Sequence, residues 1–173
     1  MKKYLTLALL SGFVLYSGNV LAAEGTGKAS ATILADLSII EADGDGLEFG
    51  YILQSDGNVI VDTSGNRTGS ATLVNGKTPK AGKFTISGNA NNLIKIDVPT
   101  TIDLTNDGGA ELEVSNVQVK IGDANSISAG DDLDGQLGAD GKLIMNVGGT
   151  LTVASNTPEG VYNGTYTVTV NYQ

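Results

Sequence analysis

Apolar and polar residues alternate along most of the chain beyond residue 28. This period of two predicts β-strands, because successive side chains of a strand point to opposite faces of a sheet. No stretch beyond the N-terminal region shows the period of a long amphipathic helix. The predicted strands cover residues 47–52, 59–62, 82–88, 92–98, 101–105, 111–120, 142–147 and 150–153.

Pairs of turn-forming residues separate these segments. Aspartate, asparagine and glycine accept the backbone angles of tight turns at little cost. The longest predicted loop runs from Gly122 to Gly141 and is dominated by Asp and Gly. Short strands at this spacing predict one antiparallel Ig-like β-sandwich, with a closed barrel as the second choice. The predicted turns are Asp56-Gly57, Asn75-Gly76, Asp107-Gly108, Asp140-Gly141 and Gly148-Gly149.

The first 22 residues have the features of a secretory signal peptide. Two lysines precede an apolar stretch from Tyr4 to Leu15, and the small-residue site Val20-Leu21-Ala22 follows. Polar and glycine residues dilute this stretch below what a membrane-spanning helix needs. We therefore expect cleavage after Ala22, passage through the periplasm, and a single domain over residues 23–173 at the cell surface or outside the cell, without membrane insertion.

The first alternating segment of the mature chain, residues 28–39, allows two interpretations. It is about as long as a whole sandwich at 3.3 Å per residue. Residues 24–41 are therefore either a donor strand that completes another molecule or the first strand of their own domain. If the segment is a donor strand, the residues of its apolar face would fill a groove in the other molecule. These residues are Ala29, Ala31, Ile33, Ala35, Leu37 and Ile39.

The last segment alternates without interruption from residue 160 to residue 173. One set of side chains should be buried and the other should meet solvent or a further strand. The hydrogen-bonding edge of this strand is a candidate surface for pairing with another polypeptide. The residues of the inward face are Gly160, Tyr162, Gly164, Tyr166, Val168, Val170 and Tyr172.

The same region resembles known families. The sequences VGGTLTV (147–153) and PEGVYNGTYTVTVNY (158–172), with LEFG (47–50) and FTISG (84–88) in matching order, resemble a bacterial family of exported Ig-like β-sandwich proteins that is catalogued only as a domain of unknown function. This resemblance covers nearly the whole mature chain. It implies an exported β-sandwich.

The last strand also resembles that of the major subunits of chaperone-usher pili. Gly160 is fourteenth from the end and Tyr172 is the penultimate aromatic residue, as in that family. The resemblance implies that residues 162–172 pair with a periplasmic chaperone and that residues 29–39 complete the fold of the next subunit. The partners would be further copies of the chain, a periplasmic chaperone and an outer-membrane usher.

The composition of the chain limits its possible partners and the interactions that stabilise its fold. The chain has a formal net charge of −9, and loss of Lys2 and Lys3 with the signal peptide leaves −11. This charge argues against nucleic acids and anionic lipids as partners. With no cysteine, the fold depends on its core and its backbone hydrogen bonds.

The residue types of common catalytic sites are scarce. There is no histidine, cysteine or tryptophan, which removes the usual general base, the thiol nucleophile and the rings of sugar-cleaving clefts. We expect no enzymatic activity, no cofactor and no metal site. The acidic residues that paired-carboxylate chemistry or calcium would use lie in glycine-rich turns, and turn formation explains them better: Asp43, Asp45, Asp123, Asp131, Asp132 and Asp134.

The sequence therefore favours a structural protein of the cell surface. The preferred hypothesis is a fimbrial subunit that assembles by strand addition and supports adhesion. The alternative is a monomeric secreted binding module for a glycan or matrix component. That alternative predicts exposed aromatic residues on loops, whereas Tyr162, Tyr166 and Tyr172 have the phase of core residues.

Overall fold

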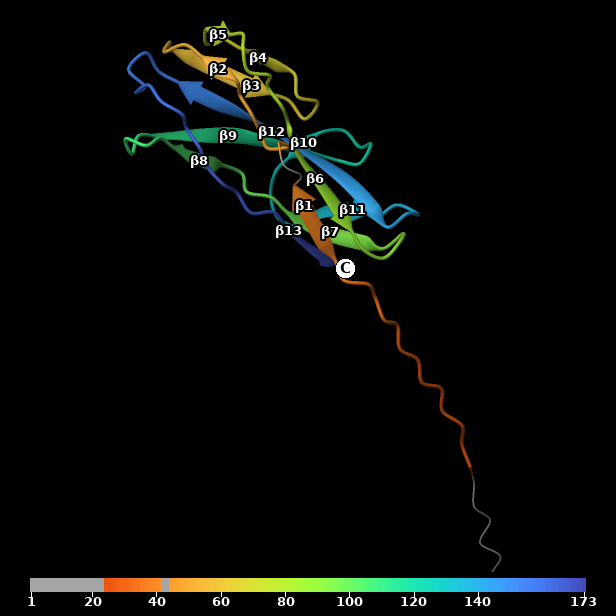
Figure 1. Ribbon diagram of the computed structural model, residues 1–173. Helices are drawn as coiled ribbons and strands as arrows, with labels where there is room; N and C mark the ends of the chain where they lie inside the picture. The colour runs from red at the N-terminus through yellow and green to blue at the C-terminus, as the bar shows by residue number, and fades with distance from the viewer. Residues whose placement is uncertain (1–23, 42–43) are drawn as a thin grey trace, which may run out of the picture. The chain divides into compact units, whose positions relative to one another are not determined.

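The computed structural model describes residues 24–41 and 44–173 (Figure 1). The predicted signal peptide lies outside these residues. Every regular element among the described residues is a β-strand, as the alternating pattern predicts, and none of them forms a helix able to span a membrane. The strands are β1 (Ser38–Glu41), β2 (Tyr51–Ile52), β3 (Gly57–Val61), β4 (Arg67–Gly69), β5 (Leu73–Val74), β6 (Gly82–Ser87), β7 (Leu93–Asp97), β8 (Ile102–Thr105), β9 (Glu111–Ile121), β10 (Ile127–Ser128), β11 (Leu133–Gln136), β12 (Lys142–Val153) and β13 (Thr169–Tyr172).

The main sheet is built around the long strand β12. Along one edge β12 pairs with β9, and along the other it pairs first with β6 and then with β3. Beyond these lie β1 next to β6, β4 next to β3, and β8 and β10 next to β9. All of these pairings are antiparallel. We call this assembly the main sheet.

The second layer contains the sheet β11-β7-β13 and the two-stranded sheet β2-β5 (Figure 1). Ile86, Val119 and Met145 of the main sheet are fully buried, as are Ile94 and Ile96 of β7, and all five belong to one apolar cluster. Burying side chains of this size stabilises a fold by about 1.5–3 kcal/mol each. The prediction of an antiparallel all-β sandwich is confirmed.

The prediction of a turn at Gly148-Gly149 is wrong. Both glycines lie within β12, and neither has a positive φ. A Cβ atom at Gly148 would lie 2.4 Å from the carbonyl oxygen of Val61, and one at Gly149 would lie 2.6 Å from a methyl group of Val114. Here β12 changes partner from β6 to β3 and shifts register with β9. These glycines therefore serve close approach between strands, which glycine also permits.

Three predicted boundaries also change. The long loop at 122–141 contains β10 and β11, which pair with β9 and β7. The predicted strand at 47–52 is reduced to β2 and a bridge from Glu48 to Lys80. The last strand is regular only over β13, although a bridge joins Asn163 to Thr105. Apart from β10, which pairs with the preceding strand β9, these segments have partners that are distant in sequence, and local alternation does not specify them.

The compact unit of the described chain runs from Ile33 to Gln173 and contains the whole sandwich. Residues 24–37 form no strand, and every side chain from Glu24 to Asp36 is exposed. The first predicted strand is therefore regular only in β1, whose four residues pair with β6 of their own domain. Ile39 lies opposite Ile86 in this pairing.

Candidate functional site

The C-terminal segment, residues 163–172, leaves part of its backbone without a partner. Asn163 bonds Thr105 through both its main-chain groups, at 2.8 and 3.0 Å, and β13 pairs with β7. Between these anchors, residues 165–168 form no main-chain hydrogen bond with the described part of the chain. The outer edge of β13 is also free, because β13 ends the order β11-β7-β13. This segment is an open strand edge of the kind that pairs with other chains.

The side chains of this segment alternate as the sequence predicts. The even-numbered residues Tyr166, Val168, Val170 and Tyr172 are half-buried and pack against the core, while Thr165, Thr167, Thr169 and Asn171 are exposed. Of the other predicted residues, Tyr162 is half-buried, with its hydroxyl donating to the Pro158 carbonyl at 2.8 Å, and Gly160 and Gly164 are exposed.

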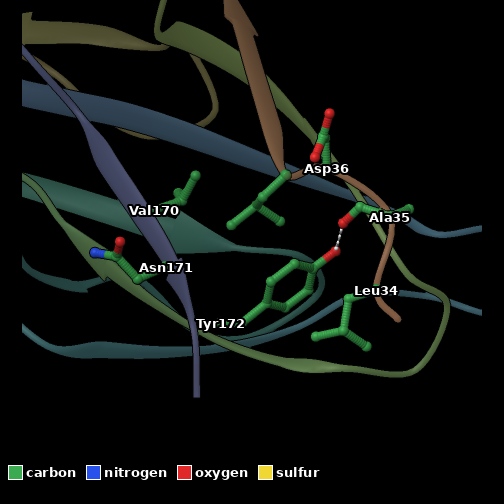
Figure 2. Close-up of a pocket in the computed structure, with 7 residues that line it drawn as sticks. Leu34, Ala35, Asp36, Val170, Asn171 and Tyr172 are labelled. Atoms are coloured by element: carbon green, nitrogen blue, oxygen red, sulfur yellow. Dashed lines mark hydrogen bonds between the residues drawn. The ribbon is translucent and has the colours of Figure 1, made fainter. Parts of the chain in front are cut away.

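The free edge of β1 in the main sheet lies beside the C-terminal segment, which belongs to the second layer. Figure 2 shows the Tyr172 ring reaching from β13 to the segment before β1, where its hydroxyl donates to the Ala35 carbonyl at 2.9 Å. The Asn89 main-chain N–H donates to the same hydroxyl at 2.8 Å. A hollow of about 350 Å³ is lined here by residues 34–37 and 170–172. The two free edges therefore meet along one flank of the sandwich.

We call this flank the seam. It is lined by core side chains that remain half-exposed. At one end Gly88 lies against Leu37 and Tyr172, and at the other Gly82 lies against Tyr166 and the main chain of Leu47. The side chains of the seam are Leu37, Ile39, Leu47, Tyr166, Val168, Val170 and Tyr172.

Tyr166 is the most enclosed polar group of the seam. Its ring contacts Phe84 edge-on, with the ring centroids 5.7 Å apart. Its hydroxyl is buried and finds no hydrogen-bond partner among the described residues. Burial, helped by the negative charge of Glu41, raises the pKa of this hydroxyl well above its usual range. Burial and Asp45 likewise raise the pKa of Glu41.

The domain of unknown function DUF4402 matches residues 37–172, which span the sandwich from the start of β1 to the end of β13. The chain belongs to the DUF4402 family. No curated protein and no solved structure matches the chain. The predicted membership of an uncharacterised family is confirmed.

The DUF4402 domain boundary separates the predicted donor residues into two groups. Leu37 and Ile39 lie inside the match and pack against the core of their own domain. Ala29, Ala31, Ile33 and Ala35 lie before it and are exposed, with Ile33 at 92%. The main-chain N–H of Ala35 donates to the Asn89 side chain at 2.9 Å, so the chain is anchored from this residue onward.

Two of the predicted acidic residues take part in loop contacts and an ion pair. Asp134 pairs with Lys95 at 2.9 Å, and Asp132 uses its main chain to bind Asp97 and Lys95. Asp43 lies outside the described residues, and elsewhere no three acidic side chains gather closely enough to hold a metal ion.

The contribution of β1 and Asn89 to the seam could not be predicted from the sequence alone. The alternation of residues 37–41 marks an apolar face, but it does not show that β6 is the partner or that Tyr172 closes over Ala35. The penultimate position of Tyr172 was the one available signal. Its contacts span 83 residues to Asn89 and 137 to Ala35.

Proposed function

We propose that this protein is a structural subunit of the bacterial cell surface that assembles by β-strand addition and supports adhesion. The observation that carries the proposal is the unpaired backbone of residues 165–168, whose alternate side chains are already seated on the core. Strand addition supplies main-chain hydrogen bonds for affinity and side-chain pockets for register. An added strand in the seam would satisfy this backbone and cover the half-exposed side chains.

The N-terminal segment of a second copy suits this role. Ala29, Ala31 and Ile33 repeat every second residue, and this is the spacing at which side chains enter one face of a groove. Two of them are alanines, which fit between the large residues already in the seam. The refined donor is therefore residues 24–34, because Ala35 is anchored to its own domain and β1 is needed by its own sandwich.

The resemblance to pilin subunits supports the same assignment. Gly160 and Tyr172 match the spacing of the terminal strand in that family, and in this fold Tyr172 ends the open edge. A periplasmic chaperone that binds this edge would protect it before assembly, because free strand edges otherwise promote aggregation. An outer-membrane usher would then exchange the chaperone for the next subunit.

The test compares unheated and heated samples of exported protein on a detergent gel. We expect a ladder that collapses to one band on heating. A variant lacking residues 24–34 should fold, as judged by circular dichroism, yet give no ladder. Ile33→Asp should also weaken the ladder, because it would place a charge in the apolar seam. Ile127→Asp is the matched control, since Ile127 is exposed at 44% on β10, away from the seam.

Two results would contradict the proposal. One is a ladder that persists unchanged in both N-terminal variants. The other is a single monomer band from the unaltered chain even after coexpression with a chaperone and usher. The second result would favour the monomeric binding module instead.

A further inference from the structure

The outer face of the main sheet turns away from the core and carries charges of both signs. Along β6, β9 and β12 the inward residues are buried, so the alternate residues point outward. We call this surface the outer face. At the outward positions of its strands, lysines occupy one end and acids the other.

Three lysines form the basic end. Lys83 and Lys120 both lie opposite Asn146, one on each side of β12, so these three side chains stand in one row. Lys142 lies on the same face of β12, next to Ser87 of β6. The outward strand positions described at this end include no acid. Four acids lie in loops and turns around it. Asp45 uses its carbonyl to accept from the Lys83 main chain at 2.7 Å, Asp62 follows β3 beside Gly148, Asp123 lies in the turn after β9, and Asp140 accepts a hydrogen bond from the Lys142 main chain.

Three acids form the opposite end. Asp103 lies opposite Glu113, and Glu111 lies opposite Thr105, where β8 pairs with β9. All three acids are exposed, while Ile102 and Val114, the pair next to Asp103 and Glu113, are buried. Seven residues separate Lys120 from Glu113 on β9, which is about 20 Å along the strand.

Exposed isoleucines accompany these charges. Ile40 and Ile144 flank Thr85 in the row beside Lys83, and Ile60 lies opposite Thr150 toward the acidic end. Their exposures are 62%, 38% and 37%. Among the described residues, the ion pairs join Lys77 to Glu48 and Lys95 to Asp134, and none involves a charge of the outer face. The face thus combines uncompensated charges with apolar side chains, as protein interfaces do.

We propose that the outer face is a docking surface for a second copy of this chain. A two-fold axis perpendicular to the middle of the face would place the basic end of each copy over the acidic end of its partner. Such a contact is isologous, so the same pairing forms twice. Five strands spaced about 4.8 Å apart, along a strand of about 40 Å, offer about 800 Å² per copy, the area of an ordinary protein interface.

Charge complementarity identifies the partner. Three lysines match three acids on the same face, and the isoleucines would pack between the sheets. A linear polyanion would use the basic end alone and would be repelled by the acidic end. Exposed ion pairs contribute little individually, so the contact should be weak and sensitive to salt. It does not depend on strand addition, because it leaves the seam free.

The experiment is sedimentation velocity of the exported, signal-free chain at rising ionic strength. We expect reversible dimers at about 20 mM salt, with an association constant at least about tenfold weaker at about 500 mM. Strand-added polymers are separated from these dimers because main-chain pairing withstands salt. Loss of one form of association therefore leaves the other measurable.

Charge reversal decides the orientation. A basic-end variant (Lys83→Glu, Lys120→Glu, Lys142→Glu) and an acidic-end variant (Asp103→Lys, Glu111→Lys, Glu113→Lys) should each be monomeric alone. Mixed in equal amounts they should form salt-sensitive heterodimers, because one outer face is then wholly acidic and the other wholly basic. The control carries Asn75→Asp, Lys77→Glu, Thr78→Glu and Lys80→Glu, which change the total charge equally off this face and outside the donor segment, and it should still dimerise.

Three outcomes would overturn the proposal: a monomeric wild-type chain at low salt, dimers that survive both reversals, or variants that fail to associate when mixed. Heparin serves as a probe polyanion. Heparin binding that depends on the three lysines, without self-association, would assign the basic end to an acidic polymer instead. Circular dichroism melts of every variant verify folding, since outward substitutions should change stability by only about 0.5 kcal/mol.

Discussion

Gly148→Ala tests whether β12 is a continuous strand that passes close to the end of β3. The added Cβ would lie 2.4 Å from the Val61 carbonyl oxygen, 2.8 Å from the Asp62 carbonyl carbon and 3.0 Å from the Thr63 nitrogen. All three are main-chain atoms, so no side-chain rotation relieves the overlap. β3 would have to move, and its pairing with β12 extends from Val61 to Gly57.

The expected loss is about 3–5 kcal/mol in the free energy of unfolding. Ordinary contact begins at 3.4 Å, so the new methyl group overlaps the Val61 oxygen by about 1 Å. Overpacking alone costs about 1–3 kcal/mol. Displacing β3 also weakens several ladder hydrogen bonds, each with a net value of about 1 kcal/mol.

Urea denaturation followed by circular dichroism measures this loss as a lower midpoint. Gly130→Ala is the matched control: its Cβ would have nothing within 4 Å, and its φ is not positive. This control should be neutral or slightly stabilising. If the two midpoints coincide, or if Gly148→Asn is tolerated as it would be in a turn, the steric argument is refuted.

Three further changes probe other contacts. Arg67→Met should lower the free energy of unfolding by about 2–3 kcal/mol. The reason is that the Arg67 guanidinium donates to the carbonyls of Phe49, Tyr51 and Val74 at 3.0–3.1 Å. A urea midpoint equal to that of Lys77→Met would contradict this. Tyr166→Phe should raise stability by about 1 kcal/mol, since it removes a buried hydroxyl without a partner among the described residues; a lower melting temperature would show that this hydroxyl is bonded. The third change concerns Asp62. Burial alone would raise the pKa of its carboxyl, but hydrogen bonds from Asn66, Ser64 and Gly65 outweigh burial and lower this pKa. The stabilisation from Asp62 is therefore present above the unfolded pKa of about 4 and is lost as the pH falls through the lower folded value. Asp62→Asn should be less stable than wild type at neutral pH, with a difference that shrinks as the pH falls below the unfolded pKa of about 4. A constant difference between their melting temperatures would refute the assignment.

Local sequence determined most of the strands and the inward face of each. The alternation at 82–88, 92–98, 101–105 and 111–120 predicts β6, β7, β8 and β9 to within one or two residues. The phase of residues 162–172 correctly predicts that Tyr166, Val168, Val170 and Tyr172 face the core. A period of two is a local property of the backbone, so it can be read without knowledge of the neighbouring strand.

Tertiary structure decided which edges meet. Whether residues 37–41 pair with β6, and whether Gly148-Gly149 turns or continues, depends on strands that lie far away in sequence. The same holds for the seam and for the outer face, where Lys83 and Lys120 become neighbours only through Asn146. Alternation indicates the direction of each side chain but does not specify the neighbouring strand. The pairing of strands is determined by the packing of the whole core.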